Sequence, residues 1–301
     1  MRKSLSNKDV SDPGMSGINM CCRYLTIFVL LCTVSITQAE EPFLFLDVAH
    51  VVQIKTAIQN QSTPYQPFVT QLRYYAEAVK ELGPWTIADH PSKAVSGDPH
   101  DYYSEGPYWW PDPDNADGPY IRKDGQRNPE RFLAHKDELI HMYQTVFILS
   151  MAGYFLDEPV YAQRAAELLR IWFVNADTKM NPHLQYAQAI PNRSAGRNFG
   201  IIDTHRFVRL IEALNLLKLS GYWSKEDAEG VKTWFRAYLD WLQTSDHGLL
   251  EKKQKNNHAT WWAAQVAAYA GFTADQAART TAWDWTRNHL IAGQIAANGS
   301  F

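Results

Sequence analysis

The residues best suited to chemistry lie in a short polar stretch that ends in two tryptophans, KNNHATWW at positions 255–262. An asparagine at the start of a helix commonly caps the first N–H groups, so Asn256 predicts that a helix begins here. Asn257 and His258 would then lie in the first turn, where free N–H groups and the helix dipole favour an anion. An amide and an imidazole at this place could hold a carboxylate while negative charge builds on it. We therefore identify Asn257 and His258 as candidate catalytic residues; the alternatives are a simple helix cap and a hydrogen-bonded core histidine.

A second candidate region is an aromatic, proline-rich loop at residues 96–120, SGDPHDYYSEGPYWWPDPDNADGPY. It lies within an irregular segment, residues 84–129, that carries eight of the fifteen prolines, and proline breaks helices. A long loop rich in aromatic residues is typical of an ordered functional segment. Sugar rings stack on Trp and Tyr faces while their hydroxyl groups meet polar side chains. The candidate substrate-binding residues here are His100, Tyr102, Tyr103, Trp109 and Trp110; the alternative is a lid that packs its aromatic residues inward.

An anionic ligand would need a local basic site, because the chain as a whole has a net charge of −3. This balance also argues against a nucleic-acid-binding protein, which would present a strongly basic face. A second irregular segment, residues 176–200, contains Gln188 and Arg197. Arg197 lies among small and aromatic residues in GRNFGIID, and we expect it to meet an anion. Gln188 and Arg197 complete the set of candidate substrate-binding residues.

Motifs for other kinds of chemistry are missing from the sequence. It has no H-E-x-x-H, no P-loop and no G-x-S-x-G. The three cysteines all lie near the N-terminus and the ten histidines are scattered, so we expect no metal ion and no cofactor. Hydrolysis of a glycosidic bond stays open, because sequence spacing does not show which carboxylates are close in space. The candidates for such a pair are Asp101, Glu105, Asp203 and Glu212.

The elements that would position these residues are helices. Apolar residues recur at helical spacing in eight segments: 48–59, 65–82, 130–154, 159–175, 201–219, 225–245, 256–270 and 274–297. Gly221 and Gly271 are expected just past helix ends, and Ser224 and Thr273 at helix starts. No strand alternation is evident. Paired helices of similar length favour an all-α fold, an incomplete (α/α) toroid with long ordered loops over a groove.

The N-terminal residues predict a secretory signal peptide. An apolar run at residues 24–36 is too short to span a bilayer and ends at Thr37-Gln38-Ala39. We expect residues 1–39 to be removed by cleavage near Ala39, and residues 40–301 to form one domain. The expected location is the periplasm or the extracellular medium, with no membrane attachment after cleavage and a monomeric state.

Three stretches together resemble the alginate lyase family of polysaccharide lyases: SGDPHDYYSEGPYWWPDP, NPHLQYAQAIPNRSAGRNFGIIDT and KNNHATWW. The resemblance covers residues 44–301. It implies a secreted or periplasmic enzyme with an incomplete α/α toroid and a groove for an acidic polysaccharide such as alginate or glucuronan. Such an enzyme cleaves a 1,4 linkage by β-elimination at a uronic acid unit, without metal or water. Asn257 and His258 match the family's Asn and His, which hold the uronate carboxylate and in some members take the proton.

The sequence departs from the family pattern at its C-terminal end. The family's arginine, which neutralises charge, and its tyrosine, which transfers the proton, follow a stretch that NGSF at positions 298–301 matches. Neither residue has a counterpart in this sequence. We therefore expect a C-terminally truncated chain with weak or no turnover, unless Tyr102 or Tyr103 substitutes for the missing tyrosine. The competing interpretations are a glycoside hydrolase on the same toroid and a non-catalytic glycan-binding protein.

Overall fold

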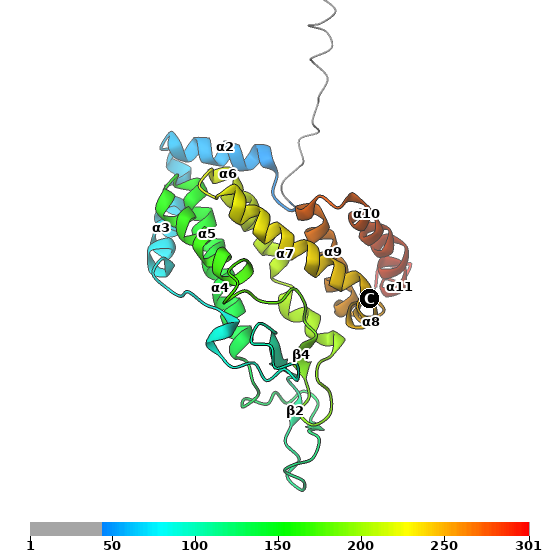
Figure 1. Cartoon of the computed structure of the whole chain (residues 1–301). Helices are drawn as coiled ribbons and strands as arrows, with labels where there is room; N and C mark the ends of the chain where they lie inside the picture. The colour runs from blue at the N-terminus through cyan, green and yellow to red at the C-terminus, as the bar shows by residue number, and fades with distance from the viewer. Residues whose placement is uncertain (1–43, 301) are drawn as a thin grey trace, which may run out of the picture. The chain divides into compact units, whose positions relative to one another are not determined.

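The computed structural model describes residues 44–300, and Figure 1 shows packed helices with long loops at one end. The helices are α2 (Val48–Gln59), α3 (Gln66–Val79), α4 (Ala134–Phe155), α5 (Pro159–Phe173), α6 (Phe207–Ser220), α7 (Lys225–Thr244), α8 (Asp246–Lys252), α9 (Asn257–Thr273), α10 (Gln276–Trp285) and α11 (Ala292–Gln294). Shorter turns are the 3-10 helices η1 (Thr63–Tyr65), η2 (Ile87–Asp89) and η3 (Asn198–Thr204), and the π-helix η4 (Thr286–Ile291). The strands are β1 (Tyr103–Glu105), β2 (Trp109–Trp110), β3 (Ile121–Arg122) and β4 (Tyr186–Ala189). The predicted all-α class is confirmed, whereas the signal sequence and its cleavage site lie outside the described residues.

The connection between α6 and α7 follows the predicted local chemistry. Gly221 ends α6 in the left-handed conformation, with a φ of 79°. Ser224 starts α7, where its hydroxyl oxygen accepts a hydrogen bond of 3.0 Å from the N–H of Asp227. The left-handed glycine and the serine cap each act on residues within three positions of themselves. The turn between α6 and α7 could therefore be predicted from the sequence alone.

The prediction for the connection between α9 and α10 is wrong. Gly271 and Thr273 both lie inside α9, and the left-handed residue that ends this helix is Ala274, with a φ of 61°. The Thr273 hydroxyl donates back to the carbonyl of Tyr269 at 2.8 Å instead of capping the next helix. The carboxylate of Asp275 caps α10 in its place.

Helix α8 is an element that the sequence analysis did not predict. It follows α7 directly, and Ser245 starts it by accepting a hydrogen bond of 3.0 Å from the N–H of Gly248. A Cβ on Gly248 would collide with the backbone of Leu242, so only glycine allows this tight turn. With seven residues, α8 is too short to show an apolar period.

Helix α4 is at the centre of the packing. Leu139, Met142, Val146 and Leu149 recur at helical spacing and are fully buried. Burial of one such side chain stabilises the folded state by about 1.5–3 kcal/mol. Helix α4 packs against α3, α5 and α6, while α9 packs against α6, α7 and α10. Among residues 44–300 this series of paired helices does not close into a barrel, and it is the predicted incomplete toroid.

Aromatic rings join four of the helices. Phe173 of α5 contacts Trp234 of α7 edge to face, with ring centroids 4.7 Å apart. Phe207 of α6 lies 6.0 Å from Phe235, and Phe235 lies 5.0 Å from Tyr269 of α9. Edge-to-face pairs prefer particular angles, so these contacts fix how α5, α6, α7 and α9 lie against one another.

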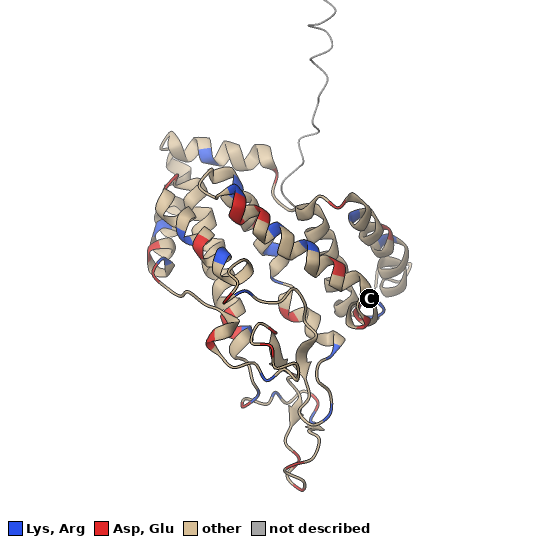
Figure 2. Ribbon diagram, in the orientation of Figure 1, with Lys and Arg blue, Asp and Glu red and all other residues tan. Residues whose placement is uncertain are grey.

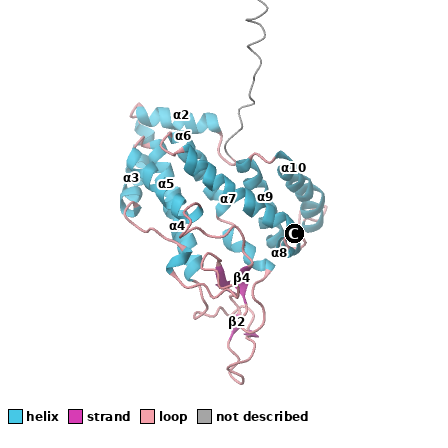
Figure 3. Ribbon diagram, in the orientation of Figure 1, coloured by secondary structure: helices cyan, strands magenta, loops and turns pink. Residues whose placement is uncertain are grey.

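The loops at one end of the helices form a layer of their own, which we call the loop layer: residues 80–133 and 174–206. Strands β1 and β4 join its two parts by pairing in parallel, with Tyr103 opposite Tyr186. Strands β2 and β3 form an antiparallel hairpin. Figure 3 shows the strands within the loops. They are too short to show the alternation of residues by which strands are recognised in a sequence.

Two glycines let segments of the loop layer approach each other closely. A Cβ on Gly196 would collide with the backbone carbonyl of Gln185, and a Cβ on Gly200 would collide with Ala187. Gln185 and Ala187 lie in or beside β4, so the glycines allow the chain to fold back along that strand.

The exposed helix surfaces carry charges of both signs. Figure 2 shows acidic and basic residues interspersed along α7. None of the helices between residues 44 and 300 is long and apolar enough to cross a membrane.

Candidate active site

The N-terminus of α9 is built by Asn256. Its side-chain Oδ1 accepts a hydrogen bond of 3.0 Å from the N–H of His258, so Asn256 is the helix cap. Asn257 is exposed, and the side chain of His258 is 18% exposed. The predicted place of Asn257 and His258 in the first turn is confirmed, and their chemical role stays a prediction.

A buried glutamate lies beside the His258 ring. Oε1 of Glu251 is 2.6 Å from Nδ1 of His258, and the side chain of Glu251 has no exposed surface. The other oxygen, Oε2, accepts a hydrogen bond of 2.8 Å from Nδ2 of Asn198. Both oxygens of the carboxylate are therefore paired, as burial of a charge requires.

Phe199 connects the His258 ring to Arg197 and Gln188. The rings of Phe199 and His258 meet edge to face with centroids 4.9 Å apart, and the guanidinium carbon of Arg197 lies 5.4 Å from the Phe199 centroid. Arg197 donates from Nε to the carbonyl of Gln188 at 2.9 Å and from Nη2 to its Oε1 at 3.2 Å. Burial, followed by the charge of Arg122, lowers the pKa of Arg197, but a guanidinium stays charged in proteins. His258 from the KNNHATWW stretch therefore lies near Gln188 and Arg197 from the irregular segment 176–200.

Trp109 lies on the other side of Arg197. The guanidinium carbons of Arg193 and Arg197 are 4.9 Å and 5.9 Å from its ring centroid. Gly106 makes room for this contact, because a Cβ there would lie 2.7 Å from Nη2 of Arg197 and 2.8 Å from Cδ1 of Trp109. Two guanidinium groups thus lie against the half-buried indole of Trp109. Their positive charges form the local basic site that an acidic ligand needs.

We call this group of residues the α9 cluster: Asn257, His258, Phe199, Arg197, Gln188 and Trp109. Trp110 has different contacts. Its Nε1 donates to the carbonyl of Gln126 at 2.9 Å, and Nζ of Lys123 lies 5.0 Å from the ring centroid. These contacts belong to the β2–β3 hairpin, so the predicted substrate contact of Trp110 stays a prediction.

Asp203 supports the strand that leads into the site. It is buried and accepts hydrogen bonds from the hydroxyls of Tyr102 at 3.1 Å and Ser104 at 2.7 Å. Ser104 Oγ in turn accepts the N–H of Gln188 at 2.9 Å. Tyr102 has no exposed surface, and its predicted substrate contact stays a prediction. Burial, followed by the charge of Asp203, raises the pKa of Tyr102 well above its ordinary value, which argues against proton transfer by this residue.

Tyr103 is also packed inward. Its hydroxyl donates to Oε1 of Glu105 at 3.2 Å, and its ring lies edge-on to Phe132 with centroids 5.4 Å apart. Burial and then the charge of Glu105 raise the pKa of Tyr103. With 6% of its surface exposed, Tyr103 packs against its neighbours, and its predicted substrate contact also stays a prediction. The burial of both tyrosines favours the alternative in which the loop packs these aromatic residues inward.

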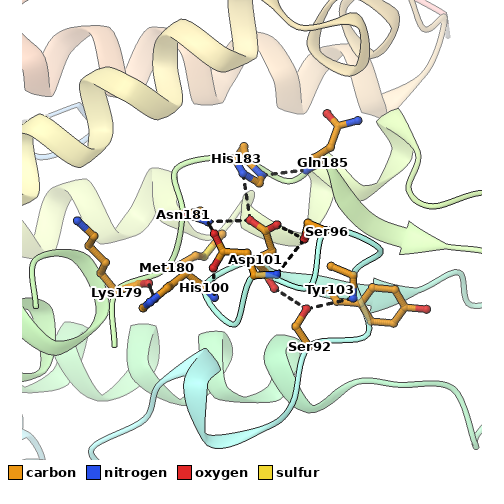
Figure 4. A network of polar contacts seen from close by, with 12 residues as sticks. Ser92, Ser96, His100, Asp101, Tyr103, Lys179, Met180, Asn181, His183 and Gln185 are labelled. Atoms are coloured by element: carbon orange, nitrogen blue, oxygen red, sulfur yellow. Dashed lines mark hydrogen bonds and ion pairs between the residues drawn. The ribbon is translucent and has the colours of Figure 1, made fainter. Parts of the chain in front are cut away.

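His100 fixes one half of the loop layer to the other. Its Nδ1 lies 2.7 Å from the carbonyl of Lys179. Figure 4 shows the network beside it, in which Nδ2 of Asn181 donates to Oδ1 of Asp101 at 2.8 Å. Nε2 of His183 lies 3.1 Å from the same oxygen. This network is separate in its contacts from the α9 cluster, and the predicted substrate contact of His100 stays a prediction.

The four carboxylates that left hydrolysis open are all buried, with at most 8% of each residue exposed: Asp101, Glu105, Asp203 and Glu212. Each is bonded to protein groups; Glu212, for example, accepts the N–H groups of Leu44 and Phe45 at 2.5 and 2.7 Å. Glycoside hydrolysis needs two carboxylates that reach the sugar from opposite sides. The geometry of these four therefore argues against the hydrolase alternative.

Three residues of this region were not predicted from the sequence. Asn198 and Phe199 directly follow Arg197 in GRNFGIID, so their place in the sequence could have signalled them. Glu251 carries no such signal, because its contact with His258 depends on the turn between α8 and α9. Among residues 44–300, no three His, Cys, Asp or Glu side chains gather as a metal site.

Comparison with known proteins finds similarity to a protein family and to a solved structure. A family described as alginate lyase matches residues 86–301. The fold is similar to the crystal structure of an alginate lyase from Bacteroides ovatus determined at 1.60 Å resolution, with 38% sequence identity and a TM-score of 0.76. The match covers 83% of this chain and 66% of that one, so this chain spans slightly less than two thirds of its length. No curated protein matches the sequence.

Proposed function

The chain belongs to the alginate lyase family, and from that premise we propose that it cleaves a 1,4-linked uronate polysaccharide by β-elimination. The observation that carries this proposal is the α9 cluster, where Asn257 and His258 start helix α9 and the His258 ring contacts Phe199, which in turn contacts Arg197. An amide, an imidazole, a guanidinium and free N–H groups all favour an anion. Each sugar unit of a uronate polymer carries such an anion on C5.

The chemistry follows from where charge develops. The C5 proton is adjacent to the carboxylate, so its removal places a second negative charge on the same group. In our proposal Asn257 and Arg197 hold this carboxylate and stabilise the dianion. Among the described residues we assign the proton transfer to Nε2 of His258, because Tyr102 and Tyr103 are buried and have raised pKa values.

The elimination is balanced without water as a reactant. The electron pair of the C5–H bond forms the C4=C5 double bond while the C4–O bond breaks. The proton on the imidazolium of His258 can then pass to the leaving oxygen. The products are a chain with a new reducing end and a chain that ends in an unsaturated uronate.

The test is the ultraviolet absorbance of the conjugated product during incubation with alginate and with glucuronan. His258→Gln should abolish the rise, while His50→Gln, a change of the same kind at an exposed histidine on α2, should leave it intact. New reducing ends without absorbance would indicate a hydrolase. Tight binding of the polymer without any product would indicate a glycan-binding protein. Either result would contradict the proposal.

We also propose that the protein is exported to the periplasm or the medium and acts as a monomer. The support for export is the apolar run at residues 24–36 that ends at Ala39. N-terminal sequencing of the exported protein should find a start near residue 40. Light scattering of the purified protein should give the mass of one chain.

A further inference from the structure

The Glu251–His258 pair joins a fully buried carboxylate to a partly exposed histidine. Their contact of 2.6 Å is shorter than two other histidine–carboxylate contacts in the described part of the chain, 3.1 Å for His183 and 3.4 Å for His90. A carboxylate without any exposed surface needs a donor at each oxygen. His258 is the donor at Oε1, and Asn198 is the donor at Oε2.

This contact determines where the proton of the His258 ring lies. An ionised carboxylate only accepts hydrogen bonds, so Nδ1 must carry the proton. In the neutral ring Nε2 is then unprotonated, and the hydrogen bond of the His258 ring among residues 44–300 is the one at Nδ1. His183 is different, because its Nε2 faces Asp101 while its Nδ1 accepts the N–H of Gln185 at 3.4 Å. His258 thus keeps one nitrogen for a ligand, whereas both nitrogens of His183 have protein partners.

We propose that Glu251 is a positioning residue, which fixes the Nδ1–H tautomer of His258 so that Nε2 is the nitrogen that accepts the substrate proton. This inference rests on the proposed β-elimination. When Nε2 takes the C5 proton, the ring becomes an imidazolium, and the nearby carboxylate stabilises its new positive charge. A buried carboxylate orients and stabilises the catalytic imidazole of serine proteases by the same physical means.

The second oxygen of Glu251 extends this role to the other side of the site. Asn198 stands between Arg197 and Phe199 in the sequence, and its hydrogen bond to Glu251 connects η3 to α8. Glu251 therefore helps to hold both the proton acceptor and the arginine. Asn198→Ala separates the two effects, because it removes the bond to η3 and leaves the contact between Glu251 and His258.

The tautomer can be measured without any substrate, from the ¹⁵N spectrum of the histidine rings in the full chain. At about pH 9, where an ordinary histidine is neutral, His258 should show a protonated Nδ1 and an unprotonated Nε2. His258→Gln assigns the signals by removing them. In Glu251→Gln the glutamine amide can donate to Nδ1, so the protonated fraction of Nδ1 should fall. A wild-type His258 with an unprotonated Nδ1 would overturn the proposal.

The kinetic test compares kcat and KM on the uronate polymer. Glu251→Gln should lower kcat at least about 10- to 100-fold, the range found when the hydrogen-bond partner of a metal-binding histidine is lost, while KM changes little. Asn198→Ala should lower kcat less. Glu138→Gln is the matched control, since Glu138 contacts His90 outside the α9 cluster, and it should keep the wild-type kcat.

The outcomes separate this inference from the proposed function. A folded Glu251→Gln with the kcat of the wild type would overturn the role of Glu251 alone. A wild type without product on any uronate polymer would overturn the proposed function, and the spectrum would still show whether Glu251 fixes the tautomer. If the melting temperature shows that Glu251→Gln does not fold, the wild-type spectrum and Asn198→Ala decide.

Discussion

Replacement of Asp203 by alanine should strongly destabilise the protein, because this one carboxylate is 2% exposed and serves three donors. The donors are Tyr102 at 3.1 Å, Ser104 at 2.7 Å and Lys136 at 2.6 Å. Asp203→Ala leaves the Tyr102 hydroxyl without its acceptor inside the core. It also frees Ser104, whose oxygen accepts the N–H of Gln188, so the change reaches the α9 cluster.

The magnitude follows from the burial of each partner. Tyr102 has no exposed surface, and an unsatisfied buried hydroxyl costs about 1–3 kcal/mol. The hydrogen bond of Ser104 contributes about 1 kcal/mol. The side chain of Lys136 is 31% exposed, so water partly replaces its lost partner and the cost is about 1 kcal/mol or less. The free energy of unfolding should fall by about 2–5 kcal/mol, which lowers the melting temperature of a domain of this size by roughly 10 °C.

The assay is urea unfolding followed by the fluorescence of the tryptophans, with thermal unfolding as a second measurement. Asp203→Asn keeps the shape and one acceptor oxygen, so its loss should be smaller. Asp240→Ala, at an exposed position on α7, should stay within about 0.5 kcal/mol of the wild type. A loss below about 1 kcal/mol for Asp203→Ala would refute the reasoning, since that is the effect of an average substitution.

Three further predictions concern the charge, packing and ligand contacts of single residues. The hydrogen bond from Arg170 lowers the pKa of Asp227 below its ordinary value of 3.8, so this pair stabilises the protein above that pH. Its contribution is lost as the pH falls through the lower folded-state pKa, and Asp227→Asn should lack this loss when unfolding free energy is measured against pH. Gly196→Ala places a Cβ against the carbonyl of Gln185 and should cost about 1–3 kcal/mol in thermal unfolding. Arg197→Lys replaces a two-pronged donor by a single ammonium, so kcat/KM on the uronate polymer should fall about 10-fold or more.

Each of these three predictions has a control elsewhere in the chain. Asp284→Asn changes a carboxylate that is 56% exposed and 3.8 Å from its arginine, and it should leave the pH dependence unchanged. A Cβ on Gly293 meets no atom within 4 Å, so Gly293→Ala should be neutral in the assay that detects Gly196→Ala. Arg236→Lys, on the exposed side of α7, should keep the wild-type kcat/KM. The reasoning fails where a variant and its control behave alike.

The parts of the fold and of the site that could be predicted from the sequence are those determined by residues close to one another along the chain. A helix cap acts over two or three positions, so Asn256 was enough to place Asn257 and His258 in a first turn. The aromatic loop was predicted by residue type, but which of its faces point inward was not. Tyr102 is buried because its hydroxyl meets Asp203, which lies 101 positions away in the sequence. A contact at that distance along the chain has no pattern from which it could have been read.

The placement of Glu251 explains why the chemistry depends on the fold as a whole and not on the KNNH stretch alone. The KNNH stretch by itself holds His258 only through the helix that it starts, which leaves the ring without a partner at Nδ1. The turn between α8 and α9 brings Glu251 to within 2.6 Å of Nδ1 of the ring, and the hydrogen bond from Asn198 holds the carboxylate from the loop layer. The proton position on the ring is therefore set by elements on both sides of α9. A change that loosens the loop layer should lower turnover before it lowers the affinity for the polymer, since affinity draws on many contacts and the tautomer on one.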